Sequence, residues 1–163
     1  MADTEIYNPT RRYKHFRPRQ ASRGMKASGV PTNLATISLF NDSTGPYVLV
    51  LRDFTLYGTA SDNVQVSYAR GQIGSSQGLV SALLPSEAIQ NGRIASIDTA
   101  TVYPGDYAIP LSTLGAYEWY HDFPFAVIQP NYSLVFQGTT AAHAVTVACV
   151  WESILVDELD FFW

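Results

Sequence analysis

The chain has 163 residues, a single cysteine and a net charge of −4 at pH 7. A domain of this size can bury roughly 70% of its unfolded surface, so its core needs no disulfide or metal for stability. The lone Cys149 excludes an intrachain disulfide, and no apolar run approaches the ~18 residues of a transmembrane helix. The first residues lack the basic and apolar regions of a secretory signal, so we expect synthesis in a reducing cytoplasm.

The charge is distributed unevenly along the chain. Residues 1–26 carry seven basic and two acidic side chains, whereas residues 27–163 carry three arginines and twelve acidic side chains. A basic segment on an acidic domain is typical of an arm that binds a phosphate backbone or an acidic protein surface, although it could also be a solubilising tail. Aromatic rings between the basic residues favour docking, because they offer apolar surface to bury. The expected docking residues are Arg11, Arg12, Tyr13, Lys14, Phe16, Arg17, Arg19 and Arg23.

The same pattern predicts three parts of the chain. Residues 1–33 are expected to form the extended basic arm and a small-residue linker, residues 34–156 the domain, and residues 157–163 an acidic and aromatic tail. Because the domain is expected to be complete without the arm, deletion of residues 1–26 should leave it folded.

The first strands are predicted from apolar residues between turn residues. They cover residues 34–40, 47–57 and 64–68. Both faces of the 47–57 strand are apolar, as expected for a central strand that is covered on both sides. Strict alternation assigns one face to Val48, Val50, Phe54 and Leu56, and the other to Tyr47, Leu49, Leu51 and Tyr57.

The middle of the chain is open to two interpretations. Residues 78–84 fit either a strand or a buried helical turn, and residues 85–90 fit a short helix that begins at Pro85. Extended segments follow at 93–103, 107–111, 117–128, 132–137 and 144–154. In the last of these, alternation places Val145, Val147, Cys149 and Trp151 on one face.

This succession of strands predicts an all-β fold, a β-sandwich of the jelly-roll or immunoglobulin-like kind. The long connections around residues 71–93 and 104–116 favour the jelly roll, because Greek-key crossings need longer links than a meander.

One motif has the form of a catalytic site. Residues 74–78 read Gly-Ser-Ser-Gln-Gly, and His143 follows with aspartates between them, in the order of an α/β-hydrolase triad. A nucleophile elbow requires a parallel α/β sheet, which this strand-rich chain cannot supply, so we interpret the segment as a connection and expect no enzyme activity. The three histidines, His15, His121 and His143, lack neighbours at ligand spacing, so neither a metal nor a cofactor is expected.

Aromatic residues concentrate between Tyr103 and Phe125. They fit a core or a subunit interface, because tyrosine and tryptophan favour sites with one dry and one wet end, and they also fit a sugar-binding platform. The residues that we assign to a subunit interface are Tyr117, Trp119, Tyr120, Phe123, Phe161, Phe162 and Trp163.

The basic arm, the β-sandwich and the acidic, aromatic tail together resemble a virion protein. The organisation is similar to that of jelly-roll cement, or decoration, proteins of tailed-bacteriophage capsids. The resemblance implies a non-enzymatic, homo-oligomeric structural protein of the virion, with capsid or other virion proteins as partners and no membrane. Two alternatives are a glycan- or receptor-binding module of a tail or fibre, and a jelly-roll coat protein that packages nucleic acid. Nucleic acid is the second choice as partner, because coat-protein arms of that kind usually carry more charge.

Overall fold

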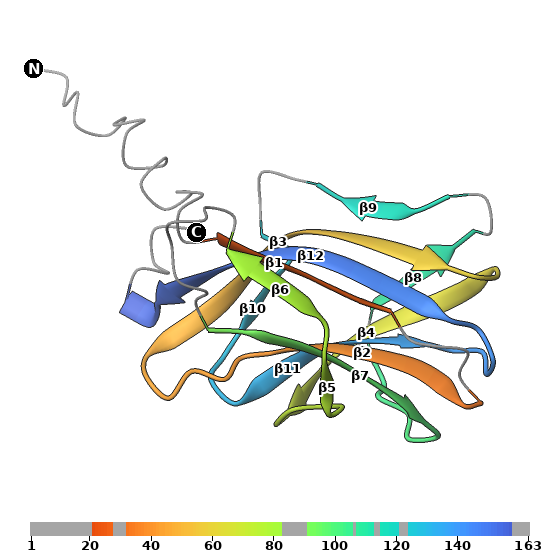
Figure 1. Ribbon diagram of the computed structural model, residues 1–163, viewed down its shortest axis with the longest axis horizontal. Helices are drawn as coiled ribbons and strands as arrows, with labels where there is room; N and C mark the ends of the chain where they lie inside the picture. The colour runs from red at the N-terminus through yellow and green to blue at the C-terminus, as the bar shows by residue number, and fades with distance from the viewer. Residues whose placement is uncertain are drawn as a thin grey trace, which may run out of the picture.

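The computed structural model describes residues 21–27, 32–82, 91–105, 107–112, 115–120 and 124–157. Their strands form two antiparallel sheets packed face to face, so the fold is the predicted β-sandwich (Figure 1). Sheet A consists of β1 (Ala21–Ala27), β3 (Tyr47–Gly58), β6 (Leu79–Ala82), β9 (Tyr117–Trp119), β10 (Ala126–Ile128) and β12 (Val145–Leu155). Sheet B consists of β2 (Leu34–Phe40), β4 (Asp62–Arg70), β5 (Ser76–Gln77), β7 (Arg93–Thr99), β8 (Tyr107–Leu111) and β11 (Tyr132–Gly138).

The strand order shows how the chain passes between the sheets. Sheet A has the order β10-β3-β12-β1-β6, with β9 also paired to β3, and sheet B has the order β5-β7-β2-β11-β4-β8. In the described chain, no two successive strands are neighbours in a sheet. The chain changes sheet at most of its connections, and where it stays in one sheet, at β4–β5, β7–β8 and β9–β10, the two strands are not paired with each other. A simple meander is therefore excluded, as the long connections predicted.

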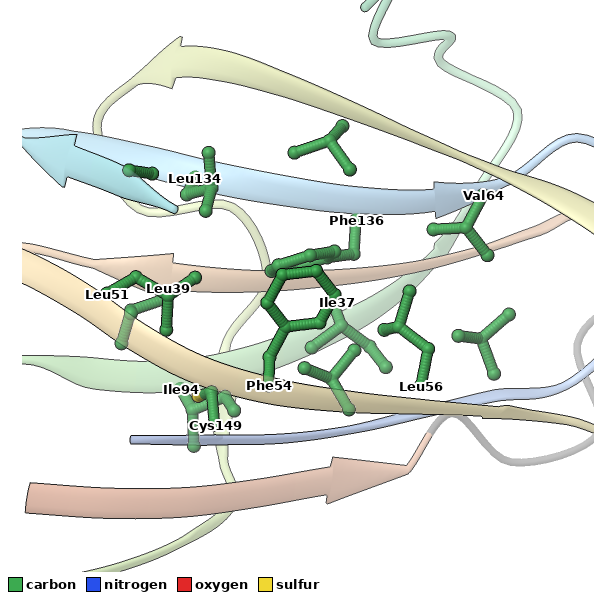
Figure 2. Packing of buried hydrophobic residues seen from close by; sticks show 14 of the residues in the cluster. Ile37, Leu39, Leu51, Phe54, Leu56, Val64, Ile94, Leu134, Phe136 and Cys149 are labelled. Atoms are coloured by element: carbon green, nitrogen blue, oxygen red, sulfur yellow. The ribbon is translucent and has the colours of Figure 1, made fainter. Parts of the chain in front are cut away.

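The core lies between the sheets. Figure 2 shows Phe54 of β3 against Phe136 of β11, and the two ring centroids are 5.3 Å apart. The alternation predicted for the last strand is confirmed, since Val145, Val147, Cys149 and Trp151 are all buried in this core. Burial raises the pKa of the Cys149 thiol to about 12, so this side chain stays protonated at neutral pH and packs as a small apolar group.

The predicted assignment of β3 side chains to the two faces of the strand is wrong, because the faces exchange in the middle of the strand. Leu49 and Leu51 lie in the core together with Phe54 and Leu56, while Val48 and Val50 belong to a separate cluster with Ile154 of β12. The cause is a β-bulge in the pairing with β12, where Trp151 pairs with Leu51 but Val150 pairs with Asp53. The extra residue, Arg52, reverses the phase of the strand, and a strictly alternating pattern cannot reveal such an insertion.

The boundary between arm and domain is also wrong. Residues 21–27, assigned to the arm, form β1, which pairs with β12 on one side and with β6 on the other. The sequence did not predict this strand because it carries few large apolar residues. The packing around the strand explains why its inward-facing residues are small. A Cβ on Gly24 would lie 2.9 Å from Cη2 of Trp151, so the core requires a residue without a side chain at this position. The domain therefore includes Ala21–Ala27, and it is incomplete without residues 21–26.

Other segments agree with the sequence in part. Of the two interpretations of residues 78–84, the structure has a strand at Leu79–Ala82. The aromatic stretch 117–128 divides into β9 and β10, which pair with different parts of the same edge of β3. The helix expected at residues 85–90 lies outside the described residues, as do residues 158–163 of the tail.

Candidate docking face

The outer face of sheet A, which points away from sheet B, carries a groove of about 620 Å³. The groove crosses β6, β1, β12, β3 and β9, which lie side by side in Figure 1. The strand registers arrange its lining in two rows. The first row runs across the sheet through Leu79, Met25, Ala148, Thr55 and Glu118. The second row, two residues further along each strand, runs through Ser81, Arg23, Val150 and Asp53.

One end of the groove is apolar and exposed. Leu79 is 75% exposed and Met25 is 46% exposed, and the two side chains are directly opposite each other on β6 and β1. At the other end Tyr120, which follows β9, is 81% exposed. Large side chains of this kind, grouped in one concavity, are typical of a surface that a partner covers.

The other end of the groove is acidic. Glu118 and Asp53 lie there on neighbouring strands, and the bulge explains the position of Asp53. Without the extra residue Arg52, position 53 would share the inward face of Leu51, whereas with it Asp53 pairs with Val150 and points outward. Bulges often redirect a side chain in this way next to functional sites.

Asp53 is a partly buried carboxylate. Partial burial raises the pKa of Asp53, although the positive charge of Arg52 acts in the opposite direction. Within the described residues, Asp53 has neither a hydrogen bond nor an ion pair. The adjacent Arg52 is directed to Glu152 instead, because its Nε and Nη2 donate to Oε2 of that buried carboxylate at 3.2 and 2.9 Å.

Of the predicted docking residues, the structure places one in the groove. Arg23 lies in β1, in the second row, and its Nε is 3.4 Å from Oγ of Ser81. The remaining docking residues lie outside the described part of the chain: Arg11, Arg12, Tyr13, Lys14, Phe16, Arg17 and Arg19.

The predicted interface aromatics divide between core and groove. Tyr117 and Trp119 are half-buried and pack on Phe54, with ring centroids at 6.0 and 6.4 Å. The Tyr117 hydroxyl lies 3.4 Å from that of Tyr107, and this hydrogen bond, together with burial, raises the pKa of Tyr117 to about 12. Tyr120 alone of the described interface residues is largely exposed, whereas Phe123, Phe161, Phe162 and Trp163 lie outside the described residues.

The serine and the histidine of the catalytic motif considered in the sequence belong to separate segments of the described chain. Ser76 lies in β5, whose backbone pairs with Ser96 of β7. His143 is instead near Asp62, with Nδ1 3.8 Å from Oδ2. That carboxylate also accepts hydrogen bonds from the hydroxyls of Thr139 and Thr140 at 2.8 and 2.9 Å, so it holds the β11–β12 connection in place.

Neither a metal-ligand cluster nor a membrane-spanning helix is present in the described ranges. Among these residues, no three histidine, cysteine or acidic side chains cluster so that they could hold a metal ion. In the same ranges no helix has the length and apolar character needed to cross a membrane.

Sequence reasoning missed most of the groove. Met25, Asp53, Leu79 and Glu118 come from four separate segments, and nothing local to any one of them indicates a shared surface. The adjacent charges of Arg52 and Asp53 interrupt the apolar run of β3, but this interruption alone does not indicate that the strand reverses its phase there. Comparison of the chain with protein-family models, curated proteins and solved structures finds no match in any of the three.

Proposed function

We propose that this chain is a non-enzymatic structural protein of a virus particle, which docks onto the capsid as a cement or decoration protein through its basic N-terminal segment. The segment from Arg11 to Arg19 would supply the attachment, and the outer face of sheet A would be covered by a neighbouring protein. The proposal places the protein in the virion, among capsid proteins and further copies of itself.

The connection of the basic segment to β1 is the observation that carries this proposal. β1 has partners on both sides, with seven register pairs to β12 and four to β6. A segment that continues such a strand is attached to an interior strand of the sheet, which is paired on both sides. Tension on a docked arm would therefore be resisted by the whole sheet, as a cement protein requires.

A glycan-binding module of a tail or fibre is the second candidate, and the groove offers a specific reason for it. Tyr120 could stack on a sugar ring, while Asp53 and Glu118 could accept hydrogen bonds from its hydroxyls. The groove favours a protein partner nonetheless, because Met25 and Leu79 add flexible apolar surface. Such surface is typical of a protein interface and offers a sugar hydroxyl no hydrogen bond.

The test is incorporation into particles. The full chain and a chain lacking residues 1–20 would be produced alongside the particle proteins encoded by the neighbouring genes, and particles would be purified on a density gradient. We expect the full chain to co-sediment and the shortened chain, which keeps β1, to remain folded and free. Equal incorporation of both chains would contradict the proposal.

The same chains distinguish a protein partner from nucleic acid. Binding of a phosphate backbone through six or more phosphate contacts would weaken by about a thousandfold or more between 50 and 200 mM salt, because counterions are released. We expect no such complex with DNA or RNA at physiological salt. A submicromolar complex with that salt dependence would favour the packaging coat protein.

A further inference from the structure

We propose that the groove on the outer face of sheet A binds residues 11–16 of a second copy of this chain, so that copies are linked by exchange of their basic arms. This inference rests on the proposed docking role of the arm and names the partner of the arm within the assembly.

Charge is the first argument. Residues 11–16 read Arg-Arg-Tyr-Lys-His-Phe, with three permanent positive charges and no acidic residue. The groove presents Asp53 and Glu118 at one end, and within the described residues neither carboxylate has an ion-pair partner. An arriving guanidinium would give the partly buried Asp53 the partner that it lacks, and such pairs with arginine are strong when bidentate.

Apolar surface is the second argument. Tyr13 and Phe16 are interspersed among the basic residues of the segment, and the far end of the groove offers Met25 and Leu79. An orientation with Arg11 and Arg12 at the acidic end therefore places Phe16 at the apolar end.

The dimensions agree with this orientation. Five adjacent strands spaced by about 4.8 Å give a row of roughly 19 Å from Leu79 to Glu118, and six residues of extended chain span about 20 Å. The segment that has the right charges thus also has the right length.

The direction of β1 favours a second copy over the same molecule. The groove rows lie at Arg23 and Met25, and β1 begins at Ala21, beyond both rows toward its N-terminal end. To return to the groove of the same molecule, the chain would have to reverse direction within the four residues between residue 16 and Ala21. The 20 residues before β1 can instead extend by up to about 66 Å, which is ample to reach a neighbour. A contact between different surfaces of this kind builds rings or chains.

A charge-reversal experiment on the full chain tests the proposal. Sedimentation velocity would compare the wild type with Glu118→Lys and with Arg12→Glu. We expect concentration-dependent association of the wild type, and a dissociation constant at least tenfold higher for either variant. Asp157→Lys makes the same change of charge as Glu118→Lys, but Asp157 lies after the end of β12 and outside the groove, so this variant should associate like the wild type.

Mixing the groove variant with the arm variant provides the decisive comparison. In the mixture, the groove of the Glu118→Lys copy meets the arm of the Arg12→Glu copy with both charges reversed, and the opposite contact is native. Association should therefore return toward the wild-type value. Wild-type protein that stays monomeric up to about 100 μM would overturn the inference. Association that is unchanged by both variants, or that persists without residues 1–20, would overturn it equally.

These outcomes are separable from those of the proposed function. If deletion of residues 1–20 blocks incorporation while the groove variants alter neither association nor incorporation, the arm docks elsewhere and only the groove is rejected. If the wild type fails to associate but binds oligosaccharides with loss of binding in Tyr120→Ala, the groove is a glycan site and arm exchange is wrong.

Discussion

Gly24 allows β1 to pack against the core because it has no side chain. Its backbone lies against the Trp151 ring, and an added Cβ would meet Cη2 at 2.9 Å and the carbonyl oxygen of Leu79 at 3.1 Å. Both neighbours are held firmly, since Leu79 contributes backbone and Trp151 is fully buried with its Nε1 donating to the Asn91 carbonyl at 3.0 Å.

Gly24→Ala should therefore destabilise the fold. We expect a loss of about 1–3 kcal/mol in the free energy of unfolding, because the core must shift to admit a methyl group. Gly115→Ala is the matched control, since nothing lies within 4 Å of the added Cβ, and it should change stability by no more than about 0.5 kcal/mol. Urea unfolding measures both. Equal stability of the two variants would show that β1 does not pack on Trp151 as described.

Asp53 and Asp42 should give stability profiles of opposite sign with pH. Partial burial raises the pKa of Asp53 above its ordinary 3.8, so its contribution is present below that pH and is lost as the pH rises through the folded value. Burial alone would also raise the pKa of Asp42, but hydrogen bonds from the Gly92 amide and Arg93 outweigh it and lower the pKa. Its contribution is thus present above 3.8 and is lost as the pH falls through the folded value.

Asparagine substitutions measure this difference. Relative to wild type, Asp53→Asn should be more favourable for folding at pH 7 than at about pH 3, whereas Asp42→Asn should be less favourable at pH 7 than at about pH 3. Urea titrations of the three proteins at both pH values give the comparison. If the two variants changed with pH in the same direction, Asp53 could not be the partly buried, unpaired carboxylate described above.

At the scale of strands, the sequence predicted those elements whose residues alternate. β2, β11 and β12 were recognisable because most of their alternate residues are apolar, and the long crossings between them excluded a meander. β1 was not recognisable, since its inward positions are Ser22 and Gly24 and only the tertiary contact with Trp151 gives them meaning. The groove could not be predicted from the sequence for a related reason. The inserted Arg52 exchanges the two faces of β3 without a recognisable sequence pattern, and the two rows of the groove bring together residues that are far apart in the chain.

Two truncations test the place of β1 in the sheet. A chain that begins at residue 21 keeps every described strand and should unfold in one cooperative transition close to that of the full chain. A chain that begins at residue 27 loses six of the seven residues of β1, which leaves β12 without one neighbour and detaches β6. It should be unfolded or aggregated by circular dichroism and light scattering, because the exposed edge is long and apolar. A stable, monomeric product of the second truncation would show that the domain is complete without residues 1–26, as the sequence predicted.

On the scale of the whole molecule, the two sheets differ in their relation to the basic N-terminal segment. The basic segment leads into sheet A, and it is the outer face of this sheet that carries the groove, with the exposed side chains of Met25 and Tyr120. Sheet B has exposed tyrosines of its own, Tyr68 at 55% and Tyr132 at 39%, and these give an internal reference for any assembly.

Hydroxyl-radical footprinting of the free and particle-bound protein tests most directly whether the outer face of sheet A is the docking face. Mass spectrometry would compare the oxidation rates of Met25 and Tyr120 with those of Tyr68 and Tyr132. We predict that assembly sharply slows the oxidation of Met25 and Tyr120, while Tyr68 and Tyr132 keep the rates of the free protein. Protection of the two sheet B tyrosines, with Met25 and Tyr120 still as reactive as in the free protein, would contradict the account.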